Sequence, residues 1–295
     1  MLLAIDVGNT ETTVGVFRGE ELACHWRMAT VASRTADEHA LLLGGFLAQE
    51  GMVLRAEGAP PGAAAVTGLA VSSVVPRLTS VLRELAQRYV RVEPVMVGPG
   101  VRTGLPILTD NPREVGADRV VNAIAAYAAY GGPVVVVDFG TATTFDAVSG
   151  RGELLGSAIA PGIQVSVSAL TERAAQLQRV ELVRPRAVIG RNTVESLQSG
   201  VVFGFAGQVD GIVRRMAAEL DGEPTVVATG GLAGVVLDVC ETLRHHDPWL
   251  TLRGLRIVYD HVAGAGQPAR EPRPAPPQPA RPRPERSRPE RSRTG

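Results

Sequence analysis

The hydrophobic pattern opens with short apolar runs separated by polar bends. Leu2–Ile5 is an unbroken apolar run of the kind that forms a buried strand, and a second run, Val14–Phe17, follows a polar bend. The next alternation predicts a third strand over Leu22–Met28. Thr35 and Glu38 then have the spacing of a capping box, which predicts a helix to about Gly51.

Strands and helices alternate over the following residues. The pattern predicts a strand over Leu69–Val74, a helix from Pro76 to about Tyr89, and a strand over Pro94–Val97. Residues 57–65 are rich in Gly, Pro and Ala and are expected to form a loop. This succession is typical of an α/β protein.

The second half of the chain repeats this beginning. Val134–Val137 is again an apolar strand that leads into an Asp-x-Gly bend, and the sequence Arg-Gly-Glu recurs after the second strand of both halves. The matched pairs are Asp6 with Asp138, Gly8 with Gly140, and Thr12 with Thr144. Two copies of one unit predict a duplicated fold with a cleft between its halves.

The remaining elements follow from the same patterns. We expect a third strand, two helices, a strand that ends in Gly230-Gly231, a further helix and a last strand. Their expected bounds are Gly156–Ala160, Ile163–Leu177, Thr193–Leu220, Pro224–Thr229, a helix to about His245, and Leu255–Tyr259. We therefore divide the chain into residues 1–115, residues 116–263 and a tail of residues 264–295.

Composition narrows the classes of function. All 30 basic residues are Arg, which excludes the P-loop with its lysine and every mechanism that forms a Schiff base on lysine. The five histidines have no metal-ligand spacing, so a zinc site or a Ser-His-Asp triad is disfavoured. Two distant cysteines, no signal peptide and no long apolar run predict reduced thiols in a cytoplasmic protein without a membrane span.

The tail differs from the rest of the chain. From Gly264 to Gly295 there are nine Pro, eight Arg and three Glu, so the net charge is 8 − 3 = +5, and no large apolar residue is present. This composition predicts disorder. A basic tail is compatible with nucleic acid or an acidic partner, but we prefer a solubilising extension and expect no nucleic-acid partner.

The bend after the first strand is the first candidate site. A carboxylate, a glycine and small polar residues at a tight turn suit a polyphosphate with its Mg²⁺. Gly8 allows a close approach, Asn9 and Thr10 donate to phosphate, and Asp6 holds the cation. The alternative is an ordinary β-hairpin turn rich in Asp, Gly and Asn. This stretch alone leaves both interpretations open.

Four stretches together resemble the type III pantothenate kinases, which belong to the superfamily of acetate and sugar kinases, Hsp70 and actin. They are Asp6–Thr10, Gly116–Arg119 with Asn122, Asp138–Thr144, and Gly190–Thr193 with Ser199 and Gly200. The resemblance implies two ribonuclease H-like α/β domains with a cleft between them, and a homodimer. It also implies ATP-dependent phosphorylation of pantothenate to 4′-phosphopantothenate, the first step of coenzyme A synthesis.

The resemblance further implies roles for single residues. Asp118 would be the general base, and Asp138 would coordinate a monovalent cation, K⁺ or NH₄⁺. ATP with Mg²⁺ would bind at Asp6, Val7, Gly8, Asn9, Thr10, Glu11, Thr12, Thr13 and Thr141, with Asp6 reaching Mg²⁺ through ATP. Pantothenate would bind at Gly116, Ala117, Asp118, Arg119 and Thr193.

Each of these roles has a structural alternative. Asp118 also suits the first turn of a helix, where it would cap the free N–H groups. Arg119 is a candidate partner for a substrate anion, or for Glu114 in a surface ion pair. Thr193 is suited to be a helix N-cap. The Gly230-Gly231 turn would pack against adenine or simply begin a helix.

Three functions compete at this point. A pantothenate kinase is the leading hypothesis, and intact carboxylates at positions 6, 118 and 138 favour an enzyme. A regulatory or accessory transcription protein that keeps the kinase fold is the second, and a kinase of another small hydroxyl compound is the third. Some members of the family carry a Tyr before Asp-Asn-Pro, and this sequence has Thr109 there, so an aromatic wall of the substrate pocket is missing or comes from elsewhere.

Overall fold

The computed structural model describes residues 1–55, 57–58, 60–98, 101, 103–173 and 180–264. The tail predicted to be disordered lies outside this part of the chain from residue 265 onward, and so does the end of the helix predicted to reach Leu177. Within the described ranges, no helix is both long and apolar enough to cross a membrane.

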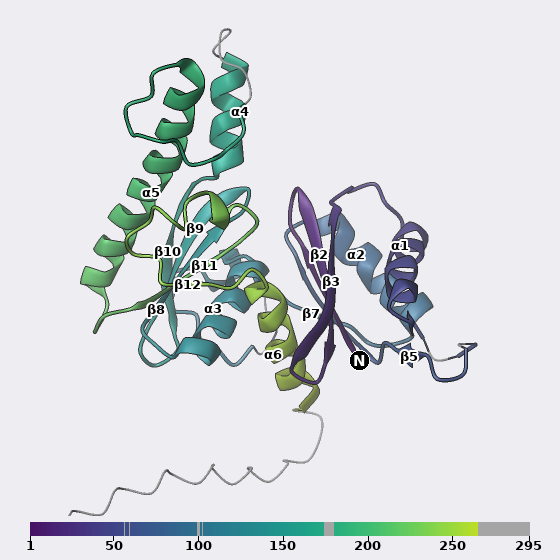
Figure 1. Cartoon of the computed structure of the whole chain (residues 1–295). Helices are drawn as coiled ribbons and strands as arrows, with labels where there is room; N and C mark the ends of the chain where they lie inside the picture. Colours follow the sequence, from purple (N-terminus) through teal and green to yellow (C-terminus); the bar gives the residue numbers. More distant parts are fainter. Residues whose placement is uncertain (56, 59, 99–100, 102, 174–179, 265–295) are drawn as a thin grey trace, which may run out of the picture.

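In the described residues, the fold consists of two five-stranded sheets, a small two-stranded sheet and six α-helices (Figure 1). The first sheet consists of β1 (Leu2–Val7), β2 (Glu11–Arg18), β3 (Glu21–Ala29), β6 (Gly68–Ser73) and β7 (Val95–Met96). The second consists of β8 (Val134–Phe139), β9 (Ala142–Val148), β10 (Leu154–Pro161), β11 (Thr225–Thr229) and β12 (His245–His246). The helices are α1 (Ala36–Gln49), α2 (Pro76–Leu85), α3 (Ala117–Tyr130), α4 (Ile163–Arg173), α5 (Thr193–Glu219) and α6 (Leu250–Gly264), and β4 (Met52–Val53) pairs with β5 (Ala64–Ala65).

The two sheets have the same topology, which confirms the duplication. Their strand orders are β3-β2-β1-β6-β7 and β10-β9-β8-β11-β12. In each sheet the first strand of the unit runs antiparallel to the second and parallel to the fourth. The bend between β8 and β9 is one residue shorter than the bend between β1 and β2, so Thr143, not Thr144, corresponds to Thr12.

Alternate residues of each central strand face different helices. In β1, Leu3, Ile5 and Val7 pack with α1 and α2, whereas Leu2 and Ala4 face α3 and α6. In β8 the odd-numbered apolar positions pack with α4 and α5, and the even-numbered ones face α3. The result is five layers, with α3 and α6 between the sheets (Figure 1). Both sheets are therefore buried on two faces, which explains their unbroken apolar runs.

The local signals for the first helix are confirmed, but two predictions near the C-terminus are wrong. Thr35 and Glu38 form the capping box of α1. After Gly230-Gly231 the chain forms only a short 3₁₀ turn, Ala233–Val235, and then β12, instead of a helix to His245. Leu255–Tyr259 is not a strand but part of α6, because Leu252, Leu255 and Val258 recur at helical spacing and bury one face.

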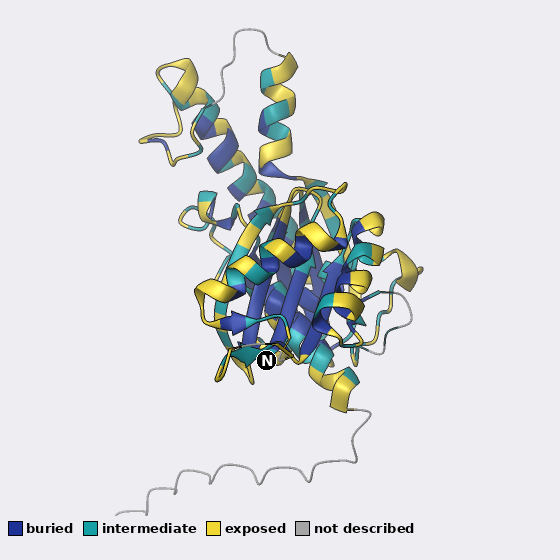
Figure 2. Ribbon diagram, turned by 90° about the vertical axis from the view of Figure 1, so that its right-hand side faces the viewer, coloured by how far each residue is buried: buried dark blue, intermediate teal, exposed yellow. Residues whose placement is uncertain are grey.

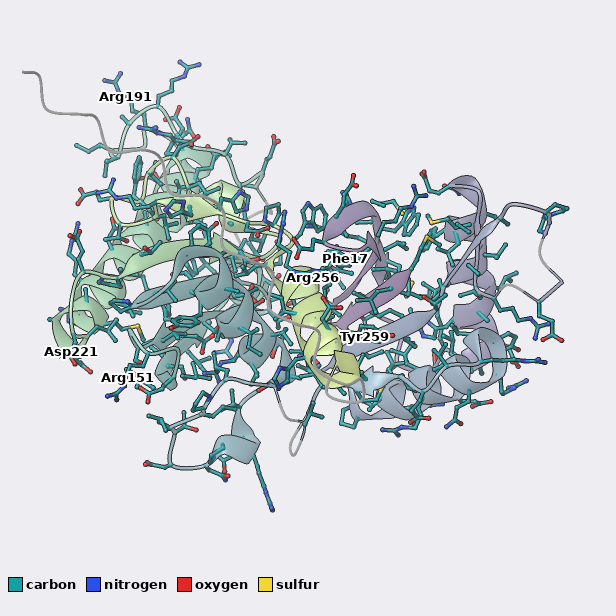
Figure 3. The ribbon with its side chains drawn as sticks, turned by 90° about the horizontal axis from the view of Figure 1, so that it is seen from below. Phe17, Arg151, Arg191, Asp221, Arg256 and Tyr259 are labelled. Carbon is teal, nitrogen blue, oxygen red and sulfur yellow. The ribbon has the colours of Figure 1, made fainter. Side chains whose placement is uncertain are left out.

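Two glycines, which have no side chain, allow α6 to approach its neighbours closely. A Cβ atom on Gly254 would overlap the carbonyl of Val121 in α3, and one on Gly68 would overlap the phenol of Tyr259. Figure 3 shows Tyr259 with Phe17 and Arg256 at the junction between α6 and the first sheet. Glycine at these positions is therefore what lets α6 lie between the sheets.

We predict that Gly254→Ala destabilises the fold by about 1–3 kcal/mol, because the added methyl forces α6 away from α3. Urea denaturation followed by circular dichroism measures this. The matched control is Gly45→Ala in α1, where nothing lies within 4 Å of the added Cβ. This change is expected to stabilise the protein by up to about 1 kcal/mol through helix propensity. Equal effects of the two substitutions would contradict the packing argument.

Candidate active site

The carboxylates of the two bends point into the middle layer. Asp6 lies on the same face of β1 as Leu2 and Ala4, and Asp138 lies on the same face of β8 as Val134 and Val136, because side chains alternate along a strand. Both faces are covered by α3. The duplication thus directs two carboxylates toward one helix.

That helix supplies the third carboxylate. Asp118 lies in the first turn of α3, and Asn122, four residues later, lies on the same side of the helix. The Asn122 amide donates to Asp138 Oδ2 at 3.0 Å, and the Thr251 hydroxyl of α6 donates to Asn122 Oδ1 at 2.8 Å. The Asn122 side chain is fully buried, so this chain of hydrogen bonds fixes the second carboxylate relative to α3 and α6.

The three carboxylates repel one another. The pKa of Asp6 is raised to about 8, first by burial and then by the nearby charges of Asp118 and Asp138. The pKa of Asp138 is raised to about 7 by burial and by the charges of Asp118 and Asp146, with the hydrogen bond from Asn122 opposing the shift. A cation placed among these oxygens would relieve the repulsion.

The two bends meet at their tips. The hydroxyl oxygens of Thr10 and Thr141 lie 3.4 Å apart, although 131 residues separate them in the chain. Each bend is closed by its own glycine: Gly8 N–H donates to the carbonyl of Glu11, and Gly140 N–H donates to the carbonyl of Ala142. The proposed nucleotide-binding residues Asn9, Thr10, Glu11 and Thr141 are exposed there, Gly8 and Thr13 are half-buried, and Val7 and Thr12 are buried.

Arg119 is held by a carboxylate that the sequence analysis missed. Its Nε and Nη2 atoms donate to Asp146 Oδ1 at 2.8 and 2.6 Å, and Asp146 is fully buried. The alternative of a surface pair between Arg119 and Glu114 is therefore wrong, and Glu114 instead accepts from the Asn111 amide. The sequence did contain a sign of this pair: Asp146 lies within the apolar run of β9, and a buried charge needs a partner of opposite charge.

Other site residues lie as follows. Asp118 Oδ1 accepts from the backbone N–H of Arg119 at 2.9 Å, which satisfies one free N–H group of the first turn, while Gly116 is the N-cap of α3 and Ala117 its first residue. Thr193 is the exposed first residue of α5 and not its N-cap, which is Asn192. Gly230, with φ of +90°, packs below Asp138: an added Cβ would lie 2.5 Å from Asp138 Oδ1.

The site fits a cation that arrives with a phosphate chain better than a closed metal cage. Within the described ranges, no group of three or more His, Cys, Asp or Glu side chains has the arrangement of a metal site. Mg²⁺ is commonly held by one or two carboxylates together with substrate phosphates and water, and the mutually repelling Asp6 and Asp138 suit that role. Oxygen ligands of this kind also suit a monovalent cation.

The fold places the chain in a class of protein, the α/β proteins with duplicated domains of the actin, Hsp70 and sugar-kinase type. The activator of the 2-hydroxyisocaproyl-CoA dehydratase from Clostridium difficile, solved with bound ADPNP, has this fold. It matches with a TM-score of 0.54 at 11% identity, over 90% of this chain and 96% of that one.

The sequence comparisons identify the family. The sequence profile of type III pantothenate kinase matches residues 2–215. The type III pantothenate kinase of Streptomyces avermitilis is 56% identical over 264 residues, which cover 88% of this chain and 98% of the relative. That of Moorella thermoacetica is 54% identical over 260 residues, with 88% and 99% covered. The chain belongs to the type III pantothenate kinase family.

We predict that the pair between Arg119 and Asp146 is essential for stability. Asp146→Ala leaves a buried guanidinium without its partner and is expected to cost about 3–5 kcal/mol. The matched control is Arg214→Ala, which breaks the exposed pair with Glu241 and should cost less than about 1 kcal/mol. Urea denaturation of both variants measures the difference. A loss of less than 1 kcal/mol for Asp146→Ala would contradict the prediction.

Proposed function

We propose that this protein phosphorylates the hydroxyl group of pantothenate with ATP, with Asp118 as the general base. The observation that carries the proposal is the gathering of Asp118 with Asp6 and Asp138 between two bends that meet at Thr10 and Thr141. Phosphoryl transfer needs positioned phosphates, charge neutralisation and a carboxylate near the attacking hydroxyl. Family membership favours this enzyme over a regulatory protein that only keeps the fold.

In the proposed reaction, Asp118 accepts the proton of the pantothenate hydroxyl. The hydroxyl oxygen forms a bond to the γ-phosphorus of ATP, the bond from that phosphorus to the bridging oxygen breaks, and ADP leaves. Since Oδ1 of Asp118 accepts from a backbone N–H, Oδ2 is the oxygen that we assign to the proton. The hydrogen bond at Oδ1 holds the carboxylate in place for this step.

The other residues would bind and orient. The first bend, with Gly8 and Thr10, and Thr141 of the second bend would hold the phosphates, and Asp6 would hold Mg²⁺ through ATP. Asp138, fixed by Asn122, would coordinate K⁺ or NH₄⁺. The bound cations would supply charge neutralisation at the phosphates. The Nε and Nη2 atoms of Arg119 donate to Asp146, and its Nη1 would donate to an oxygen of pantothenate.

We also propose a homodimer formed through an arm, defined here as residues 163–173 and 180–194. Figures 1 and 2 show α4 and the start of α5 projecting beyond the sheets. Of the eleven exposed large apolar side chains in the described residues, six lie in this arm. They are Val165, Leu170, Val183, Val188, Ile189 and Val194. A second copy covering them would remove this apolar surface from water.

The arm also carries Thr193, the proposed pantothenate contact. Arg191, two residues earlier, points away from the body of the molecule (Figure 3). Asp118, in contrast, lies between the sheets. The proposed dimer therefore offers a route by which the Thr193 of one protomer contributes to the site of its partner.

Two further expectations remain proposals. Residues 1–115 and 116–263 would act as the two halves of the enzyme, with α6 of the second half packed on the first sheet. The protein would work in the cytoplasm, where its two free cysteines, Cys24 and Cys240, stay reduced.

We predict that Asp118→Asn lowers kcat by about 10²–10⁴-fold, because the amide cannot accept the proton. Steady-state kinetics measures this, with calorimetric titration of ATP as the control, and ATP affinity should stay within a few-fold. A wild-type substrate panel of pantothenate, pantetheine and sugars tests the substrate. Full activity of Asp118→Asn would contradict the assignment of Asp118 as general base. Preference of the wild-type protein for another compound would contradict the assignment of pantothenate as substrate.

We predict that Ile189→Asp, at a side chain 85% exposed, dissociates the dimer, because a carboxylate would be buried at the contact. Sedimentation velocity should show at least about a tenfold weaker self-association. Leu41→Asp is the matched control: Leu41 is 78% exposed on α1, away from the arm, and its variant should stay dimeric. A monomeric wild-type protein, or a dimeric Ile189→Asp variant, would contradict the arm as the interface.

A further inference from the structure

A row of side chains crosses the inner face of the first sheet beside the first bend. Asp6 of β1 pairs with Thr13 of β2, and Thr13 pairs with Arg27 of β3, so the three residues stand side by side. Paired side chains on neighbouring strands share one face, with Cβ atoms about 4.5–5.5 Å apart. The Cβ of Arg27 therefore lies two strands away from that of Asp6, on the face of the sheet that carries the site.

The guanidinium of Arg27 lies near three parts of the site: the start of β2, Trp249 and the turn after β11. Its Nε lies 3.5 Å from Glu11 Oε1, at the start of β2. Its Cζ lies 5.2 Å from the ring centroid of Trp249, and the ring of His25 lies 3.7 Å from that of Trp249, tilted by 30°. Its Nη1 lies 3.6 Å from the position that a Cβ of Gly231 would occupy. Arg27 thus spans from the first bend to the turn after β11.

The duplication provides an internal comparison. In the second sheet, Asp138 pairs with Thr144, and Thr144 pairs with Ile159 of β10. Ile159 therefore stands where Arg27 stands in the first sheet, and it is exposed. Because the same fold accepts an apolar residue at this position, the fold itself does not require a cation there.

The negative charge of the site, in contrast, favours a cationic side chain beside the phosphate chain. Asp6, Asp118 and Asp138 lie together beside the first bend, where a phosphate chain with several negative charges would bind, and Glu11 adds a fourth carboxylate at the end of that bend. The chain has no lysine, and Arg119 is held by the buried Asp146 and is assigned above to pantothenate. Arg27, in contrast, is paired with a half-exposed carboxylate, and such a pair contributes at most about 1 kcal/mol. A phosphate group can therefore replace Glu11 as its partner.

We propose that Arg27 binds the phosphate chain of the nucleotide, and that Trp249 is the positioning residue that holds its guanidinium there. The guanidinium lies over the indole ring, with its Nε on the side of Glu11 and its Nη1 on the side of the Gly231 turn. The forked donors match two phosphate oxygens. The proposal rests on the proposed use of ATP and adds a binding residue from β3.

Calorimetric titration of the full chain with MgATP, MgADP and adenosine, without pantothenate, tests the proposal. Arg27→Gln is expected to weaken MgATP binding about 10- to 100-fold, the loss of a charge-assisted contact, and to weaken MgADP as well. Adenosine affinity should stay unchanged, because adenosine has no phosphate. Arg27→Lys should recover part of the loss. Trp249→Leu should show the same selective loss in smaller measure, and Trp249→Phe should restore it.

The controls separate binding from structure. Arg18→Gln, at the exposed far end of β2, should leave all three affinities unchanged. Thermal unfolding should give similar midpoints for all variants. An MgATP affinity of Arg27→Gln within twofold of wild type would overturn the proposal, and so would an equal loss for adenosine, which would mark a structural role. Absence of wild-type activity on pantothenate would overturn the proposed function alone, since nucleotide binding is measured separately.

Discussion

The organisation of this protein depends on placing like charges together in a layer that is otherwise apolar. Three carboxylates, Asp6, Asp118 and Asp138, share the space between the two sheets, and burial together with mutual repulsion raises the pKa of Asp6 and of Asp138. Such an arrangement is unfavourable until cations enter. The site therefore favours the binding of cations, and the surrounding packing has to be stable enough to hold the carboxylates close together in their absence.

The packing that maintains the site comes from the middle helices. Two sheets of identical topology each direct one carboxylate inward, and α3 and α6 fill the space between them. The hydrogen bonds from Thr251 to Asn122 and from Asn122 to Asp138 connect α6, α3 and β8 in one chain. Because Asn122 is fully buried, its two hydrogen bonds cannot be replaced by water without opening the core.

Local and repeated signals could be predicted from the sequence, whereas contacts between distant segments could not. The capping box at Thr35 and the paired Asp-Gly bends were sufficient to predict α1 and the duplication. The pair between Arg119 and Asp146 joins two elements with no common pattern, although a charge within an apolar strand was a sign of it. The helix α6 was taken for a strand because its short run of Leu, Ile and Val suits either structure, and its helical spacing shows only over a longer window.

The duplication also shows where the two halves have diverged, and that difference carries functional information. At equivalent positions of the same sheet the first half has Arg27 and the second half has Ile159. At equivalent bends, the first is one residue longer, while the second is shorter and is joined to Gly162, whose N–H donates to the Thr141 carbonyl. A longer bend with a nearby cation suits a phosphate chain, and a carboxylate held by Asn122 suits a single ion. If the proposed roles hold, the two halves of a symmetric fold divide the binding of an asymmetric substrate, because each has kept the inward carboxylate and changed its surroundings.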